Sequence, residues 1–171
     1  MTPSSRPVLP DQLKSGLKLV FCGTAAGRKS AQTKSYYAHA QNKFWATLYA
    51  VGLTPRQIAP SEYDALLRYG IGLTDIAKFA SGMDHQLPRD ALGHEAVAAL
   101  KVRICKANPA ILAFTSLNGG RKVMGPKAVA GEQTLRLGDS RVFILPSPSP
   151  LAANHWDIAP WRELACAVRA L

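Results

Sequence analysis

The sequence predicts an α/β fold of three layers, α/β/α, with a central, mostly parallel sheet of four strands. Short apolar runs alternate along the chain with longer stretches of helical periodicity. Gly, Pro and polar residues separate these stretches. The 171 residues, 47% of them apolar, suffice for one domain with a sizeable core. Strands that alternate with helices favour parallel pairing, with helices on both faces of the sheet.

The first ten residues differ in composition from the rest of the chain. Pro and Ser are frequent over residues 1–10, which predicts a flexible lead-in, and residues 11–171 are expected to form a single domain. The apolar run 17–22 then predicts the first strand.

Two helices are predicted between the first and second strands. Apolar residues recur at helical spacing over 42–51, and Gly52 is expected to end this helix. The next helix is expected to have its N-cap within 60–64 and to run to about Tyr69, where Gly70 stops it.

The second half of the chain continues the alternation. The apolar run 71–76 predicts a strand with Asp75 at its carboxyl end, and the apolar stripe over 90–108 predicts the clearest helix. The remaining predicted elements are strands over 110–115 and 141–145 and helices over 119–129 and 160–171.

Polar or small residues follow each predicted strand. They lie at 23–27, at Thr74 and Asp75, at 116–118 and at 147–150. In open parallel sheets the ligand crevice lies outside the carboxyl ends of the strands. The pattern therefore predicts that these four segments meet at one edge of the sheet.

The chain is strongly basic, because 21 Lys and Arg against 11 Asp and Glu give a net charge of +10. Such an excess favours polyanions through counterion release and faster encounter. It is also compatible with a basic surface that has no such partner. No G-x-x-x-x-G-K-S/T or G-x-G-x-x-G segment is present, which argues against generic nucleotide binding.

The cysteines and histidines show no metal-ligand pattern. Cys22, Cys105 and Cys166 are far apart, lie in apolar stretches and have no C-x-x-C spacing, so reduced core cysteines are expected. We expect neither a structural nor a catalytic metal. No signal-peptide pattern occurs over 1–10, and no apolar run approaches the roughly 18 residues of a membrane span, so a cytoplasmic protein without a membrane segment is expected.

The segment 20–45 is the most informative part of the sequence. The first apolar run breaks at a Gly-x-x-x-Gly turn, Gly23 to Gly27, which is expected to set backbone N–H groups at the mouth of a pocket. The aromatic pair Tyr36 and Tyr37 follows and can wall that pocket. Both features suit a flat, polar, ring-shaped ligand such as a nucleobase.

This segment resembles the first motif of the uracil-DNA glycosylase superfamily, in its mismatch-specific and thymine-DNA glycosylase branch. That branch reads Gly-Ile-Asn-Pro-Gly, then an aromatic-Ala-His/Pro stretch, then Asn-x-Phe-Trp. The residues in register are Gly23, Gly27, Tyr37, Ala38, His39, Asn42, Phe44 and Trp45. Segments 36–39 and 70–75 also resemble the hypoxanthine-DNA glycosylase branch, and 145–151 is similar to the superfamily's Pro-Ser-Pro second motif.

The resemblance implies how a base would be held. Tyr37 is expected to stack on an extruded base, and the N–H groups of Thr24 and Ala25 are expected to face a base carbonyl. Asp75 stands where thymine-specific relatives have an asparagine that reads the base edge. Its carboxylate would accept from a ring N–H, or alternatively activate water and stabilise positive charge on the sugar. Ser147 stands where one branch has a histidine that stabilises the departing base.

One departure from the pattern concerns the attacking water. Ala25 replaces the asparagine that holds the attacking water in the mismatch-specific branch, and a methyl group cannot orient water. The resemblance to hypoxanthine-type relatives, which have an asparagine at the start of the Asn-x-Phe-Trp segment, implies Asn42 as the alternative water-holding group. Asp75 is the second candidate catalytic group. Each also has a structural interpretation as a helix N-cap. Phe44 and Trp45 are expected in the core.

The remaining candidate residues are expected to contact DNA. The stiff loop of Pro148, Ser149 and Pro150 would pinch phosphates, and Leu151 would wedge into the duplex. The basic side chains expected to contact phosphates are Arg28, Lys29 and Lys34.

The resemblance implies a monomeric DNA repair glycosylase, a monofunctional hydrolase without cofactor, that flips uracil out of DNA and releases it as free base. No activated amine is expected at Lys43, which argues against a Schiff-base lyase. Two alternatives stay open. One is the same chemistry on hypoxanthine or another deaminated or mismatched base. The other is a non-catalytic protein that binds lesions or abasic sites.

Overall fold

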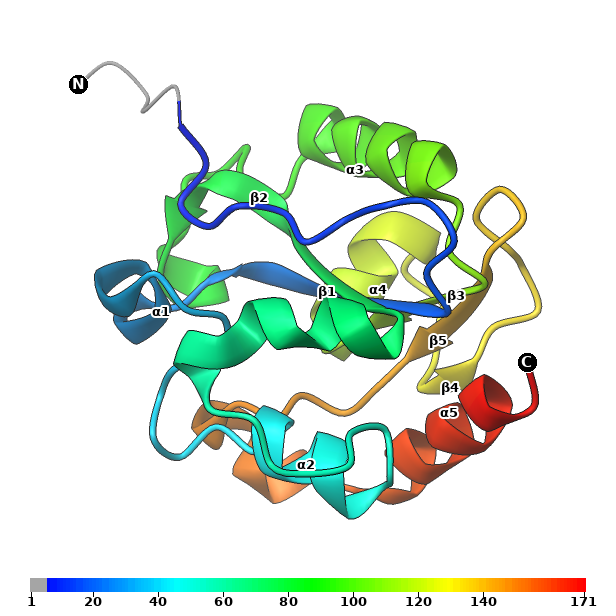
Figure 1. Cartoon of the computed structure of the whole chain (residues 1–171). Helices are drawn as coiled ribbons and strands as arrows, with labels where there is room; N and C mark the ends of the chain where they lie inside the picture. Colours follow the sequence, from blue (N-terminus) through cyan, green and yellow to red (C-terminus); the bar gives the residue numbers. More distant parts are fainter. Residues whose placement is uncertain (1–5) are drawn as a thin grey trace.

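The computed structural model describes residues 6–171, which form a sheet covered by helices on both faces (Figure 1). The strand order is β2-β1-β3-β5-β4. The parallel strands are β1 (Leu19–Ala26), β2 (Ile71–Ser81), β3 (Ile111–Phe114) and β5 (Arg141–Ile144). The predicted three-layer fold and its four parallel strands are confirmed. The short strand β4 (Gly131–Glu132) pairs antiparallel with β5, and its two residues carry no periodicity from which a strand could be predicted.

The hydrogen-bonded ladders on the two sides of β1 end at different residues. The ladder between β1 and β3 ends where Cys22 lies opposite Phe114, whereas the ladder with β2 continues in register to Ala25 and, after a shift, to Ala26 opposite Ser81. The chain passes from β1 to β2 on one side and returns to β3 on the other, so the strand order reverses between β1 and β3. Parallel sheets bind ligands at such a reversal, outside the carboxyl ends of the strands.

One face of the sheet is covered by α2 (Phe44–Ala50), the 3₁₀ helix η1 (Pro60–Tyr69) and α5 (Ala159–Arg169). Phe21 of β1 is fully buried there and stacks on Trp161 with ring centroids 5.8 Å apart. Phe44 and Trp45 of α2 also lie in this cluster, at 0% and 4% exposure, so their predicted place in the core is confirmed.

The opposite face is covered by α3 (His94–Ala107) and α4 (Leu117–Met124). Val20 and Cys22 of β1 point to this side because successive side chains of a strand alternate between faces. The apolar stripe of α3 meets them through Leu100 and Ile104.

The helices differ from the predictions mainly at their ends. The Glu62 side chain accepts the Ala59 N–H at 3.1 Å, so the start of η1 is fixed by Glu62 rather than by Ser61 or Asp64. The polar residues after Gly27 form a short helix, α1 (Arg28–Thr33), which no apolar periodicity predicts. β2 continues five residues past the predicted end at Ile76, which places Asp75 inside a strand and excludes a helix N-cap role.

The N-terminal segment is not a loose lead-in where the structure describes it. Leu9 is 1% exposed, the Val8 N–H donates to the Lys78 carbonyl at 2.7 Å, and the Pro10 carbonyl accepts from the Tyr36 hydroxyl at 2.9 Å. A single apolar side chain among prolines gives no periodic signal, which is why composition suggests a loop without contacts. Residues 1–5, the rest of the predicted lead-in, lie outside the described residues.

Only one of the three cysteines lies in the core. Cys22 is 1% exposed, and burial raises the pKa of its thiol. Cys105 and Cys166 are exposed, so their expected burial is wrong; each lies on the outer side of an amphipathic helix. Across residues 6–171 no helix combines the length and the apolar character needed to cross a bilayer.

Candidate functional site

A cavity of about 690 Å³ opens at the carboxyl ends of the strands. Its lining includes members of all four predicted strand-end segments, namely 23–27, Asp75, Ser116 and 147–150. Residues 36–39 and Asn42, from the stretch that leads into α2, complete one side. The edge predicted from the alternation of strands and loops is therefore the edge that carries the cavity.

The inner part of the cavity combines a carboxylate with two hydroxyls around Gly23. A Cβ at Gly23 would lie 2.6 Å from Asp75 Oδ1, 3.4 Å from the Tyr37 hydroxyl and 3.7 Å from Thr115 Oγ1. Gly23 and Asp75 lie opposite each other in the β1–β2 ladder, so only glycine leaves room for this carboxylate. The absent side chain of Gly23 thus gives the site its shape.

Asp75 is a buried carboxyl group whose pKa lies a little below neutral pH. It is 5% exposed, and burial raises its pKa from 3.8 to about 6. Lys78 and Arg103 oppose this rise in pKa, whereas Asp11 adds to it. A carboxyl group with this pKa is mostly ionised at pH 7 and above. It then accepts hydrogen bonds without donating any.

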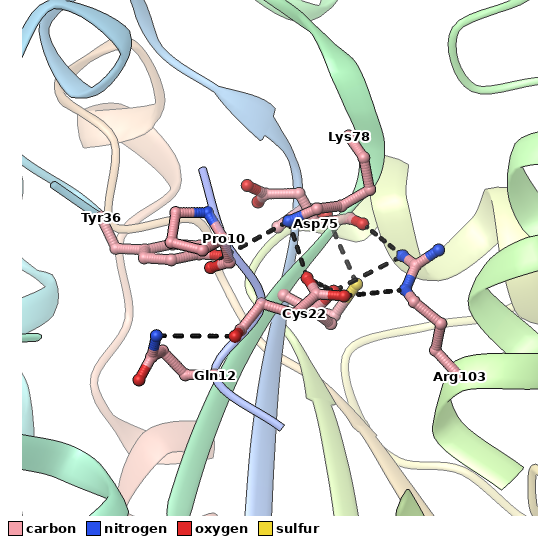
Figure 2. A network of polar contacts seen from close by, with 10 residues as sticks. Pro10, Gln12, Cys22, Tyr36, Asp75, Lys78 and Arg103 are labelled. Atoms are coloured by element: carbon pink, nitrogen blue, oxygen red, sulfur yellow. Dashed lines mark hydrogen bonds and ion pairs between the residues drawn. The ribbon is translucent and has the colours of Figure 1, made fainter. Parts of the chain in front are cut away.

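A network of charged groups lies behind Asp75 (Figure 2). Asp11 makes ion pairs with Lys78 at 2.7 Å and with Arg103 Nε at 3.2 Å, and it accepts the Thr74 hydroxyl at 2.7 Å. Arg103 donates to the main-chain carbonyl of Asp75 at 2.8 Å. Its Nε has no hydrogen bond beyond that ion pair. The network holds β2 in place beside the cavity and leaves the Asp75 carboxylate to the cavity side.

Tyr37 faces the cavity through an unusual backbone conformation. Its φ of 50° lies in the left-handed region, which non-glycine residues adopt at a cost of about 1–3 kcal/mol when the surroundings enforce it. One ring face stacks on Phe44, at 3.8 Å between centroids and 18° between planes, while the ring lines the cavity. The hydroxyl is 3.0 Å from Thr115 Oγ1. Burial raises the pKa of Tyr37 well above its ordinary value, so the phenol stays protonated.

Thr24 and Ala25 both line the cavity, and both belong to β1 rather than to a turn. In a parallel strand the main-chain groups of alternate residues point to the same side. The Cys22 carbonyl accepts the Thr115 N–H on the β3 side, so the Thr24 main chain faces that side beyond the end of the ladder. Ala25 instead faces β2. The Thr24 N–H is therefore the better placed of the two for a ligand.

Asn42 lines the cavity and lies one residue before Lys43, which is the N-cap of α2, so the predicted N-cap is off by one residue. Asn42 Oδ1 accepts the Phe44 N–H at 2.9 Å, which fixes the orientation of the side-chain amide. The Nδ2 group and the second lone pair of Oδ1 remain for a ligand. The structural and catalytic interpretations of Asn42 are thus compatible in one side chain.

The Pro-Ser-Pro loop lies directly against the first motif, because the Lys43 N–H donates to the Pro148 carbonyl at 2.9 Å. Ser147 Oγ accepts the Ser149 N–H, and Ser149 Oγ accepts the Leu151 N–H. These bonds stiffen the loop before the 3₁₀ helix η3 (Pro150–His155). All five residues 147–151 line the cavity, and Leu151 is 72% exposed at its mouth.

The three predicted phosphate contacts are not equally placed. Arg28 and Lys29 begin α1, are exposed and line the cavity. Lys34 follows α1 and is not among the lining residues; its ammonium donates to the Val8 carbonyl at 3.4 Å. The geometry favours Arg28 and Lys29 over Lys34 as contacts for a ligand in this cavity.

Two parts of the site are not predicted from the sequence. Thr115 closes the floor beside Tyr37, and its position at the end of a predicted strand is the one signal that could have singled it out. Residues 82–86 form a further wall, and their composition carries no motif. Among the described residues, no three His, Cys, Asp or Glu side chains gather in a way that could hold a metal ion.

Comparison with known proteins supports the same family and the same fold. A family model of the uracil DNA glycosylase superfamily matches residues 10–167. The solution NMR structure of a Methanosarcina acetivorans protein, provisionally assigned as a uracil DNA glycosylase, aligns over 96% of this chain and 98% of its own, with a TM-score of 0.66 and 19% identity. That likeness supports the fold. Because the family match spans nearly the whole chain, this protein belongs to the uracil DNA glycosylase superfamily.

Proposed function

We propose that the protein is a monofunctional DNA glycosylase that takes uracil out of the duplex into the cavity and hydrolyses its N-glycosidic bond. Membership of the superfamily gives the class of activity, a DNA glycosylase. The choice of base and the roles of the residues are our proposal. An abasic site and free uracil are the products.

The observation that carries the proposal is the polar floor of the cavity. The Asp75 carboxylate and the hydroxyls of Tyr37 and Thr115 meet around Gly23. Uracil presents a ring N–H flanked by carbonyls. The carboxylate would accept from that N–H while a hydroxyl or the Thr24 N–H donates to a carbonyl. Cytosine has an unprotonated ring nitrogen at the same position, so it would face the carboxylate with a lone pair and be rejected.

The ring of Tyr37 supports the plane of the base. Its left-handed backbone and its stacking on Phe44 fix the ring, so an incoming base meets a preformed surface. Stacking of a base on an aromatic side chain contributes about 1–3 kcal/mol.

Asn42 and Asp75 are the groups we assign to the chemistry. Asn42 would hold the attacking water through its free lone pair, because Ala25 offers no polar group. If Asp75 does not read the ring N–H, its alternative role is to stabilise, through its negative charge, the positive charge that develops on the sugar as the bond breaks; one carboxylate does not easily do both. Ser147, which also lines the cavity, would donate to the departing base through its hydroxyl.

The test is base release from oligonucleotides that carry uracil, hypoxanthine, cytosine or adenine at one position. Abasic sites are converted to strand breaks by alkali and counted under single-turnover conditions. We expect cleavage at uracil and none at cytosine or adenine. Asp75→Ala and Asn42→Ala should each lower the rate by about 100-fold or more. Asn42→Asp keeps an oxygen that can accept the Phe44 N–H and a lone pair that can hold water, so it should be faster than Asn42→Ala. Full activity in both alanine variants would remove these assignments.

Two other outcomes would redirect the proposal. Faster cleavage at hypoxanthine than at uracil would assign the same site to a deaminated purine, whose ring N–H and adjacent carbonyl present the same pattern to Asp75. Tight, salt-sensitive binding to lesion DNA without any alkali-labile product would identify a non-catalytic binder, in line with Ala25 and Ser147 in place of two catalytic groups of relatives.

A further inference from the structure

The cavity wall formed by residues 82–86 is the first part of the segment that connects β2 to α3, and it lies against the end of β1. Gly82, with a φ of 127°, turns the chain at the end of β2, and the short 3₁₀ helix η2 (Asp84–Gln86) follows. The Gly82 N–H donates to the Ala26 carbonyl at 2.9 Å. The wall therefore begins beside the segment of β1 that faces the cavity.

The carboxylate of Asp84 joins this wall to two other segments. Its Oδ1 accepts the Thr24 hydroxyl at 2.5 Å, and its Oδ2 accepts the Asn118 side-chain amide at 2.7 Å. Thr24 belongs to β1 and Asn118 to the first turn of α4, so the two partners are 60 and 34 residues away in the sequence. A single side chain thus ties together three segments that surround the cavity.

The tie reaches the part of β1 that the sheet holds least. Beyond Cys22 the strand has no β3 partner, and its register with β2 shifts after Ala25. Thr24 lies between these two points. The hydrogen bond from the Thr24 side chain therefore restrains a main-chain segment that β3 no longer holds.

The charge of Asp84 separates two interpretations of this contact. Asp84 is exposed and lines the same cavity as Arg28 and Lys29. A negative charge at the mouth of a site for DNA weakens binding, so removing a merely superficial carboxylate should tighten DNA binding and leave the chemistry unchanged. Removing a restraint on Thr24 should slow the chemistry even when DNA binding does not weaken.

We propose that Asp84 is a positioning residue, which bridges Thr24 and Asn118 and so fixes the Thr24 main chain against the bound base. The inference rests on the proposed function, in which the Thr24 N–H is one of the donors to a base carbonyl. Asp84 acts through Thr24 and makes no contact with the reacting bond.

The test compares Asp84→Ala and Asp84→Asn with the control Asp64→Ala, which removes the same charge from an exposed position of η1 outside the cavity lining. Asp84→Ala should lower the single-turnover rate of uracil release by about 10-fold or more, because misplaced groups lose catalysis steeply. Its DNA Kd should equal or fall below that of Asp64→Ala. Asp84→Asn should recover most of the rate, because an amide can donate to Thr24 Oγ1 and accept from Asn118. Equal rates in Asp84→Ala and Asp64→Ala would overturn the proposal.

A second readout does not depend on catalysis. Hydrogen exchange at the Thr24 and Ala25 amides, measured by NMR, should be faster in Asp84→Ala and in Thr24→Val than in Asp64→Ala. Thr24→Val removes only the donor of the bridge, so it carries the test if Asp84→Ala fails to fold. If the unaltered protein releases no base from any oligonucleotide, the proposed function fails, while exchange still reports on the bridge. Unchanged exchange in both variants would overturn the proposal independently.

Discussion

At the scale of single residues, the site depends on a pair that lies side by side in the β1–β2 ladder. Gly23 leaves out a side chain, and the Asp75 carboxylate occupies the space beside it. Burial raises the pKa of Asp75 to about 6, so the charge that this group carries at neutral pH lowers the free energy of unfolding. Proteins tolerate such a cost where the charged group has a function.

The pKa of Asp75 predicts a specific effect of pH on stability. The folded protein binds the proton more tightly than the unfolded chain, so this group's contribution is fully present below pH 4 and is lost as the pH rises through about 6. The rise from 3.8 to about 6 corresponds to about 3 kcal/mol. Asp75→Asn, permanently neutral, should therefore be more stable than the unaltered protein at pH 8 and nearly equal to it at pH 4. Urea denaturation at both pH values checks this, with Asp64→Asn as control. An equal difference at the two pH values would contradict it.

Gly23→Ala should damage the site through a steric clash. The added Cβ would lie 2.6 Å from Asp75 Oδ1, closer than such atoms approach in proteins. We expect a loss of about 1–3 kcal/mol in the free energy of unfolding, typical of overpacking, together with a strong loss of base release. Gly27→Ala is the matched control, since nothing lies within 4 Å of its Cβ. In an Asp75→Ala background the cost of Gly23→Ala should shrink; a cost that stays the same would show that Asp75 is not the obstacle.

At the scale of elements, the sequence predicts well where strands and loops lie. It predicts poorly how far each strand extends. Apolar runs identify the cores of β1, β2, β3 and β5, because buried parallel strands need continuous apolar residues. The extension of β2 to Ser81 is not predicted, since Lys78 is polar and its burial depends on distant partners, above all on its ion pair with Asp11. That pairing joins residues 67 positions apart and leaves no local trace.

The same reason explains which parts of the candidate site the sequence reveals. Tyr37, Asn42 and Ser147 belong to stretches that resemble motifs, and all three line the cavity. Thr115 and Asp84 gain their place only from contacts with distant residues, Tyr37 and Thr24. Their exact role depends on packing, which periodicity and composition do not encode.

The loop that begins at Ser147 should act on DNA through its exposed end. Leu151 is 72% exposed, so Leu151→Ala should change the free energy of unfolding by less than about 0.5 kcal/mol. If Leu151 enters the duplex, its loss should slow uracil release, and more so opposite adenine than opposite guanine, because the mismatch is easier to open. Leu135→Ala, at a site 67% exposed outside this cavity, is the control. Equal rates for the two variants would exclude the wedge.

At the scale of the whole molecule, the net charge of +10 and the position of the cavity act together. The cavity opens at one edge of the sheet, and α1 brings Arg28 and Lys29 to its rim. A basic rim around a polar pocket suits a polyanion that presents one base at a time. Stacking and hydrogen bonds would then choose the base, while the rim holds the backbone.

Salt dependence tests the contribution of the rim. If both cations contact phosphates, the double variant Arg28→Ala, Lys29→Ala should lower the slope of log Kd against log salt concentration by about 1.8 for duplex DNA. Lys101→Ala, Lys106→Ala removes the same charge from exposed positions of α3 and should change the slope far less. Parallel slopes for the two double variants would place the DNA elsewhere.

The proposed function requires that the cavity between Tyr37 and the end of β1 receives a base taken out of DNA. A crystal structure with a duplex that contains 2′-fluoroarabino-uridine, whose glycosidic bond resists hydrolysis, tests it most directly. We expect the uracil ring to stack on Tyr37, with its N–H toward Asp75 and a carbonyl toward the Thr24 N–H. A uracil that stays stacked in the duplex, or that enters the protein away from Asp75, would contradict it.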